Sequence, residues 1–310
     1  MTAVRVAAHA KINLFLRVLA RETSGFHQIE TAFALLELAD ELTVRRTDSG
    51  VTLEVEGPDL GPSDENLAVR AARMVLDATG NRFGVTIKLT KRIPVRAGLG
   101  GGSSDGAAAL HAVNALAGTA VPRHELHHFA ARLGADVAFF ASGAALALAW
   151  GRGERQFRMP APPSLPALVA VPPVQVATRD AYAWWDEQNR SPSPSPSPSP
   201  SPSPSQRGPV TLDADVLATW GSIGRLGGND FEAIVFAKHP DVRTLYERMA
   251  ETGPIWVRLC GSGSAIAAVY KKESERDDAV QRLGEKRQRL IKTTTRSSVS
   301  DGPKPIEGIV

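Results

Sequence analysis

A glycine-rich segment at residues 94–105 constrains this chain more than any other part of its 310 residues. Its sequence is Pro-Val-Arg-Ala-Gly-Leu-Gly-Gly-Gly-Ser-Ser-Asp, and it runs directly into the alanine-rich stretch Gly106–Leu116, which favours a helix. Glycine lets a backbone adopt positive φ and approach a ligand closely, and the first turn of a helix carries unpaired N–H groups and a partial positive charge. The segment therefore predicts a phosphate-binding loop at a helix N-terminus.

The spacing of this loop excludes two common nucleotide-binding motifs. A Walker A loop ends in Gly-Lys-Ser/Thr, whereas this loop ends in Gly-Ser-Ser. A dinucleotide fingerprint needs a glycine three positions after Gly100, where this chain has Ser103. We therefore expect neither a P-loop nor a Rossmann turn.

Periodicity on both sides of the loop predicts mixed helices and strands. Before residue 160 we expect strands at 4–18, 31–38, 40–46, 51–56 and 84–91, helices at 63–79, 103–116 and 122–134, and two strands flanking 151–154. After it we expect strands at 167–171, 256–260, 265–270 and 290–295, and helices at 178–185, 213–220, 230–236, 240–251 and 273–283. The second set fits a ferredoxin-like order, so we predict an α+β chain with domains at 1–158 and 159–297 and a flexible tail at 298–310.

An uninterrupted Ser-Pro alternation occupies Ser191–Ser205. Proline at every second position removes backbone donors and fixes φ, so neither a helix nor a sheet can form. We expect an extended or disordered spacer inserted in the second domain, and a docking site for a proline-binding partner is the alternative.

Composition and charge exclude several classes of protein. The net charge of +3 comes from scattered basic residues, which argues against a nucleic-acid partner. The most apolar run, at 138–150, is shorter than the roughly 20 residues that span a bilayer, so no membrane partner is expected. The lone Cys260 permits no internal disulfide, and no signal peptide is evident, so we predict a cytoplasmic protein. The sequence leaves monomer and homodimer open.

Two charged residues stand in apolar surroundings and are candidates for chemistry. Asp136 precedes the apolar run 137–140, where a carboxylate is expected to be partly buried and to need a partner. Lys11 interrupts an apolar strand, where a charge is unexpected unless it is paired or functional. The alternatives are a turn or helix-capping aspartate and an outward-facing strand lysine.

The loop pattern Pro-x3-Gly-Leu-Gly, followed by Gly/Ser residues and a helix, resembles the ATP loop of the GHMP kinases. Five other segments resemble motifs of the branch of that family whose substrate is a cytidine-diphosphate-linked methylerythritol, and they follow the same order: Ala10–Leu14, Gly25–His27, Gly134–Phe140, Asn229–Glu232 and Gly261–Ser264. Six segments in order make the resemblance specific. This chain departs from the branch at Phe26, where a tyrosine is usual, and at Ala138, where a proline is usual.

The resemblance implies a two-domain fold, with a ribosomal-protein-S5-like N-terminal domain and a ferredoxin-like C-terminal domain around a cleft. It implies that ATP, with Mg²⁺, phosphorylates the 2-hydroxyl of the cytidine-diphosphate-linked methylerythritol, a step towards isoprenoid precursors. Asp136 would be the catalytic base, and Lys11 would lie beside it. The implied ATP-binding residues are Asn66, Pro94, Val95, Arg96, Ala97, Gly98, Leu99, Gly100, Gly101, Gly102, Ser103 and Ser104. The implied substrate-binding residues are Asn13, Phe26, His27 and Tyr182, and the metal ligands are not assigned.

Other functions compete with this interpretation. The pattern His-Glu-x-x-His at 124–128 matches zinc proteases, but both histidines are expected on the water-facing side of their helix. A serine hydrolase would use Ser104, with Asp136 and His239 following, but its elbow needs a strand running directly into the serine. Another GHMP kinase, acting on homoserine, mevalonate or a sugar, is the nearer alternative. A non-catalytic nucleotide-binding protein is the third, although it would not need both Lys11 and Asp136.

Overall fold

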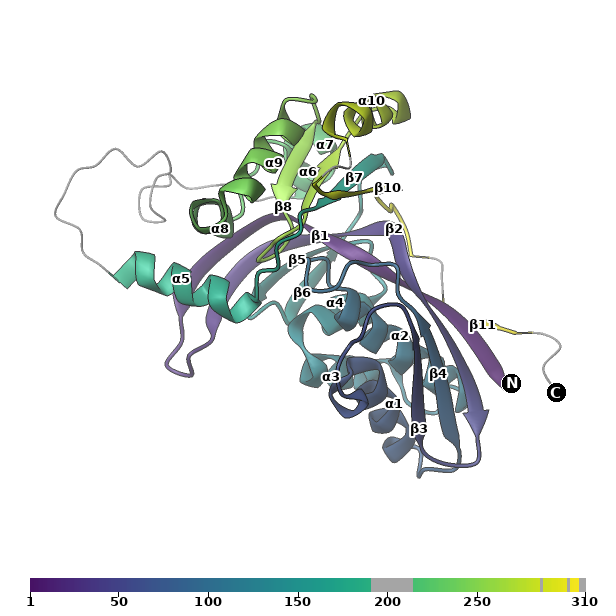
Figure 1. Ribbon diagram of the computed structural model, residues 1–310. Helices are drawn as coiled ribbons and strands as arrows, with labels where there is room; N and C mark the ends of the chain where they lie inside the picture. Colours follow the sequence, from purple (N-terminus) through teal and green to yellow (C-terminus); the bar gives the residue numbers. More distant parts are fainter. Residues whose placement is uncertain (191–213, 285–286, 300–301, 307–310) are drawn as a thin grey trace.

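The computed structural model describes residues 1–190, 214–284, 287–299 and 302–306. Within them the chain forms a seven-stranded sheet and a four-stranded sheet, each covered by helices (Figure 1). The Ser-Pro alternation at 191–205 and part of the predicted tail lie outside the described residues.

The larger sheet is built on a long antiparallel hairpin of β1 (Ala3–Arg21) and β2 (His27–Thr47). One half of β2 pairs with β4 (Gly84–Thr90), and the other half pairs with β5 (Leu146–Gly151). The remaining strands are β3 (Val51–Glu56), β6 (Arg155–Met159) and β11 (Lys304–Pro305).

The prediction of two strands at 31–38 and 40–46 was wrong, because β2 is continuous. Ala39 and Asp40 pair with His9 and Ala8 of β1. The predicted gap fell at Ala39, and Asp40 beside it has its side chain fully buried against Lys91. A buried ion pair therefore permits a charged residue inside the strand.

The helices on the larger sheet share one core with β1, β2 and β4. They are α1 (Leu67–Ala78), preceded by the short 3₁₀ helix η1 (Ser63–Glu65), then α2 (Gly101–Leu116), α3 (Arg123–Leu133) and α4 (Ala135–Ser142). Asn66 caps α1, because its side-chain oxygen accepts a hydrogen bond from the N–H of Ala68 at 2.9 Å. Helix α2 begins two residues earlier than predicted, with Gly100 in the left-handed region at its N-cap.

The smaller sheet has the strand order β10-β7-β9-β8, with antiparallel neighbours throughout. This is the order expected of a ferredoxin-like sheet. Its strands are β7 (Pro166–Val171), β8 (Trp256–Leu259), β9 (Ile266–Val269) and β10 (Arg289–Thr294). Its helices are α5 (Thr178–Arg190), α6 (Ala214–Leu217), α7 (Trp220–Ile223), α8 (Phe231–Lys238), α9 (Pro240–Ala250) and α10 (Glu273–Leu283).

The hairpin of β1 and β2 also reaches into the second half of the chain. The indole N–H of Trp256 donates to the carbonyl of Leu14 at 3.1 Å, and the N–H of Asp230 donates to the carbonyl of Leu16 at 2.9 Å. Helix α5 lies across the far end of the hairpin (Figure 1). The two sheets therefore meet along the middle of β1. Across the described residues, we find no helix with the length and apolar character that crossing a membrane requires.

Candidate active site

A cavity of about 940 Å³ opens where the two sheets meet. Its walls come from the middle of β1, the glycine-rich loop, the start of α4 and the first turns of α5. All but one of the residues implied by the resemblance line it: Lys11, Asn13, Phe26, His27, Asn66, Pro94, Val95, Arg96, Ala97, Gly98, Leu99, Gly100, Gly101, Gly102, Ser103, Asp136 and Tyr182. The structure therefore brings together segments that lie far apart in the sequence, and the individual roles stay predictions.

Two glycines of the loop are required by both conformation and contact. Gly98 has φ +80°, and a Cβ built there would lie 1.8 Å from the carbonyl oxygen of Cys260. Gly100 has φ +72°, and a Cβ there would lie 2.9 Å from the Phe140 ring. Any larger side chain would push the loop away from its neighbours.

Backbone hydrogen bonds attach the loop to β1 and to the second half of the chain. The N–H of Lys11 donates to the carbonyl of Leu99 at 3.0 Å, and the N–H of Ala265 donates to the carbonyl of Ala97 at 3.2 Å. Residues 101–103 form the first turn of α2 and line the cavity, where unpaired helix N–H groups favour an anion. The loop is thus fixed in place with the start of its helix facing the cavity.

Ser104 is the one implied ATP-binding residue that does not line this cavity. Its side chain is buried and lines a separate cavity of about 530 Å³ next to α2, together with His111. The role of Ser104 in binding ATP therefore stays a prediction.

The structure lacks the local features that the serine-hydrolase and zinc-protease patterns require in the described residues. Strand β4 ends at Thr90, so no strand runs directly into Ser104. His124 and His128 are exposed on α3, as predicted. Among the described residues no group of three His, Cys, Asp or Glu side chains is placed to hold a metal ion.

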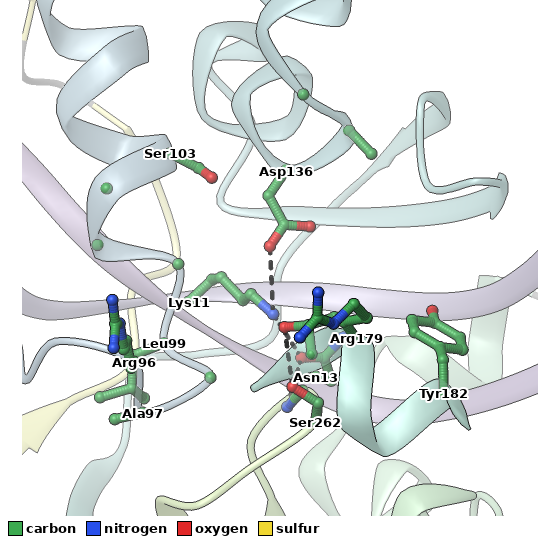
Figure 2. A pocket seen from close by; sticks show the side chains of 18 of the residues that line it. Lys11, Asn13, Arg96, Ala97, Leu99, Ser103, Asp136, Arg179, Tyr182 and Ser262 are labelled. Atoms are coloured by element: carbon green, nitrogen blue, oxygen red, sulfur yellow. Dashed lines mark hydrogen bonds and ion pairs between the residues drawn. The ribbon is translucent and has the colours of Figure 1, made fainter. Parts of the chain in front are cut away.

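Lys11 and Asp136 meet in the middle of the cavity (Figure 2). The ammonium of Lys11 lies 3.6 Å from Oδ2 of Asp136, and the Lys11 side chain is 5% exposed against 35% for Asp136. A register shift in β1 between His9 and Lys11 interrupts regular alternation beside this lysine. The partial burial predicted for Asp136 is observed.

Asn13 links this pair to the second half of the chain. Its Oδ1 accepts hydrogen bonds from the Lys11 ammonium at 2.7 Å and from the N–H of Gly261 at 3.1 Å. Its Nδ2 donates to the hydroxyl of Thr31 at 2.9 Å. Both polar atoms of the Asn13 side chain are therefore hydrogen-bonded, and Oδ1 holds the Lys11 ammonium in the cavity beside Asp136.

Sequence reasoning missed a buried ionic cluster beneath the start of α2. The Lys91 ammonium donates to Asp40 and, at 2.7 Å, to Asp105, and the three side chains are at most 3% exposed. Asp40 also accepts from the backbone N–H groups of Arg92 and Ile93 at 2.5 and 2.8 Å. Nothing local in the sequence shows that these residues meet.

The cluster holds one cation and two carboxylates. Burial raises the pKa of Asp105 to about 7; the charge of Lys91 opposes this shift, and Asp40 adds a smaller upward contribution. Burial alone would lower the pKa of Lys91, but Asp105 and Asp40 more than compensate, so its pKa is raised. Lys91 therefore stays charged, and Asp105 retains its proton far above the usual range of an aspartate.

This arrangement predicts a pH dependence of stability. Between the ordinary pKa of 3.8 and about 7, Asp105 is ionised in the unfolded chain and protonated in the folded protein. The folded state then binds more protons, so the contribution of Asp105 to stability falls as pH rises through this window. We expect the wild type to lose stability relative to Asp105→Asn over this range and the difference to level off above it. Denaturant unfolding at several pH values measures this, and parallel pH profiles would contradict it.

The far end of the cavity is aromatic. His27, at the start of β2, stacks on Tyr182 of α5 with ring centroids 4.5 Å apart and planes at 16°. Phe26 is exposed, and the guanidinium of Arg152 covers one of its faces at 4.2 Å. Burial, together with the charge of Asp136, raises the pKa of Tyr182 well above its usual range, so its hydroxyl stays protonated. Because His27 and Tyr182 are in direct contact, a base cannot lie between these two rings.

Three further cavity residues were not singled out from the sequence. Arg179 and Thr178 begin α5, and Asp186 lies two turns further along this helix. The hydroxyl of Thr178 lies 3.1 Å from that of Ser262, in the loop that carries Gly261. Figure 2 shows Arg179 and Ser262 beside Lys11, between the glycine-rich loop and Tyr182. Neither the start of α5 nor the Ser262 loop could be assigned to the cavity from the sequence, because the two halves of the chain had first to be placed together.

Comparison with known proteins agrees with this geometry. The family described as GHMP kinases N terminal domain matches residues 66–149, and the family described as GHMP kinases C terminal matches residues 216–288. The 4-diphosphocytidyl-2-C-methyl-D-erythritol kinase of Solibacter usitatus is 38% identical over 90% of this chain and 84% of its own length. That of Moorella thermoacetica is 35% identical over 95% of this chain and 100% of its own length.

Solved structures give the same result for the fold. A 4-(cytidine 5'-diphospho)-2C-methyl-D-erythritol kinase superposes with a TM-score of 0.77 at 34% identity, covering 94% of this chain and 98% of the other. A homoserine kinase from Cytophaga hutchinsonii superposes with a TM-score of 0.69 at 20% identity, covering 98% and 97%, and shows the fold alone. The predicted two-domain α+β fold is confirmed. This chain belongs to the GHMP kinases and, within them, to the 4-diphosphocytidyl-2-C-methyl-D-erythritol kinase family.

Proposed function

We propose that this protein transfers the γ-phosphate of ATP to the 2-hydroxyl of 4-diphosphocytidyl-2-C-methyl-D-erythritol. The observation that carries the proposal is the Lys11–Asp136 pair, which lies between a phosphate-binding loop and an aromatic end in one cavity. Phosphoryl transfer needs aligned reactants and compensation of charge more than covalent help. This arrangement provides both.

Each member of the pair has a distinct proposed role. The half-exposed carboxylate of Asp136 accepts the proton of the acceptor hydroxyl as the new bond to phosphorus forms. The buried ammonium of Lys11, held by Asn13, orients that hydroxyl and stabilises charge on the reacting oxygens. A protein that only bound nucleotide would need neither group in this position.

ATP is proposed to bind with its phosphates on the first turn of α2. The positive end of the helix and the glycine backbone favour phosphate oxygens there, and Ser103 adds a hydroxyl. Mg²⁺ enters as part of the nucleotide substrate, because this ion usually keeps phosphates and waters among its ligands. Asn66, which already caps α1, lines the same end of the cavity.

The cytidine end of the substrate is proposed to occupy the aromatic end. Phe26 offers an exposed face for a pyrimidine, and His27 and Tyr182 close the wall behind it. Arg179 lies between this end and Lys11, where a diphosphate would need a cation (Figure 2).

Release of ADP with a panel of alcohols tests the substrate. The panel contains the cytidyl-methylerythritol compound, mevalonate, homoserine and galactose, each with ATP and Mg²⁺. We expect turnover of the first compound alone, because only it fills both the reacting centre and the aromatic end. Turnover of another alcohol would contradict the substrate assignment while leaving the kinase activity. No turnover of any compound, with ATP still bound, would favour a non-catalytic nucleotide-binding protein.

A further inference from the structure

Helix α5 holds the imidazole of His27 on three sides. The Nε2 atom lies 2.7 Å from Oδ1 of Asp186, one ring face stacks on Tyr182, and Trp185 meets the ring edge-on at 5.6 Å. These three residues share one face of α5, because they stand three and four positions apart. His27 and Asp186 are both 8% exposed, and both line the cavity. The position of His27 is therefore set by a helix from the other half of the chain.

The contact with Asp186 also determines where the imidazole carries its proton. A carboxylate only accepts hydrogen bonds, so Nε2 must be the protonated nitrogen. The guanidinium of Arg21 lies 3.4 Å from Oδ2, the other carboxylate oxygen of Asp186. In a neutral imidazole with its proton on Nε2, Nδ1 is a hydrogen-bond acceptor. The described residues supply no hydrogen bond to Nδ1 of His27.

We propose that Asp186 is a positioning residue that fixes this tautomer of His27, so that Nδ1 accepts a hydrogen bond from the exocyclic amine of cytosine and discriminates against uracil. The inference rests on the proposed function. Cytosine carries an NH₂ donor at position 4, where uracil carries a carbonyl acceptor. Two acceptors facing each other cannot form a hydrogen bond, and leaving both unpaired in a closed site is costly.

The surroundings of His27 make the tautomer matter. Stacking on Tyr182 and the contact with Trp185 prevent the ring from turning over to exchange its two nitrogens without displacing side chains of α5. Selection of the base by His27 then depends on which nitrogen holds the proton rather than on a change of ring orientation. Asparagine at position 186 has nearly the same shape but can donate from its amide, which permits the opposite tautomer.

The experiment compares the cytidine substrate with its uridine counterpart in wild type, Asp186→Asn, His27→Asn and the double variant. We expect the wild type to prefer the cytidine compound by about 10²-fold or more in kcat/KM, as buried hydrogen-bonding groups can achieve. Asp186→Asn should raise KM for the cytidine compound and reduce the preference by about tenfold, with KM for ATP unchanged. In the His27→Asn background it should have no further effect on the preference, because Asp186 acts through His27.

Glu187→Gln is the matched control, because it changes the exposed neighbouring carboxylate on the same helix. Imidazole ¹⁵N shifts of the free protein give a readout independent of activity, with the His27 signals assigned from His27→Asn. They should show Nε2–H in the wild type and a shift towards Nδ1–H in Asp186→Asn. Thermal unfolding checks that the variants are folded.

The outcomes separate this inference from the function on which it rests. A wild type that does not phosphorylate the cytidine compound would overturn the proposed function and the base-recognition role with it. An active wild type whose preference is unchanged in Asp186→Asn would overturn the present inference alone. A loss of preference that persists undiminished in the His27→Asn background would also overturn it, because Asp186 would then act by another route.

Discussion

Asp136→Asn is expected to lower kcat for phosphoryl transfer by about 10²- to 10⁴-fold, the usual contribution of a positioned general base. Asparagine keeps the size of the side chain and its position at the start of α4, 3.6 Å from Lys11 in the wild type. It cannot take the proton of the acceptor hydroxyl. Because Asp136 is not among the groups proposed to hold the phosphates of ATP, KM for ATP should change little.

Steady-state kinetics with both substrates, together with ATP binding by calorimetry, measure this effect. Asp278→Asn is a suitable control, since it removes an exposed carboxylate from α10 without approaching the cavity. Near-normal kcat in Asp136→Asn would exclude Asp136 as the base. A large rise in KM for ATP with unchanged kcat would instead indicate that Asp136 binds the nucleotide.

Gly98→Ala is expected to be the most damaging single methyl group that can be added to the phosphate loop. The new Cβ would lie 1.8 Å from the carbonyl oxygen of Cys260 and 3.2 Å from that of Gly263, and both obstacles are backbone atoms. Its φ of +80° adds strain that a side chain cannot relieve. We expect a destabilisation of about 3 kcal/mol or more, the range of severe steric and backbone substitutions.

Thermal and denaturant unfolding measure the loss of stability, and ATP binding to the folded fraction measures displacement of the loop. Gly221→Ala is the matched control, because an added Cβ there meets nothing within 4 Å and its φ is not in the left-handed region. A Gly98→Ala protein with wild-type stability and ATP affinity would contradict the prediction, because the backbone at Cys260 and Gly263 would then have moved aside at little cost.

Local patterns predicted most of the cavity wall. The glycine-rich loop could be recognised because its glycines and the helix-favouring residues that follow them are close together in the sequence. Lys11 and Asp136 were conspicuous because each is a charge beside apolar residues. The resemblance then added His27 and Tyr182, and the structure places all four in one cavity.

The parts that sequence reasoning missed depend on contacts between distant residues. Asp40, Lys91 and Asp105 come from three different segments, and no local pattern shows that they meet. Asp186 gains meaning only when α5 lies against the hairpin, because its partner His27 is 159 positions away.

The contacts that the β1–β2 hairpin makes with the second half of the chain have a consequence for synthesis on the ribosome. These strands emerge well before the residues that they contact. Leu14 and Leu16 bond with Trp256 and Asp230, and Leu38 bonds with Thr293. The apolar residues in this half of the hairpin therefore stay exposed to solvent until the segments that cover them, as late as Thr293, have been synthesised. Such an interval favours non-native association, so the last step of folding should be the closure of the chain's second half over its own beginning.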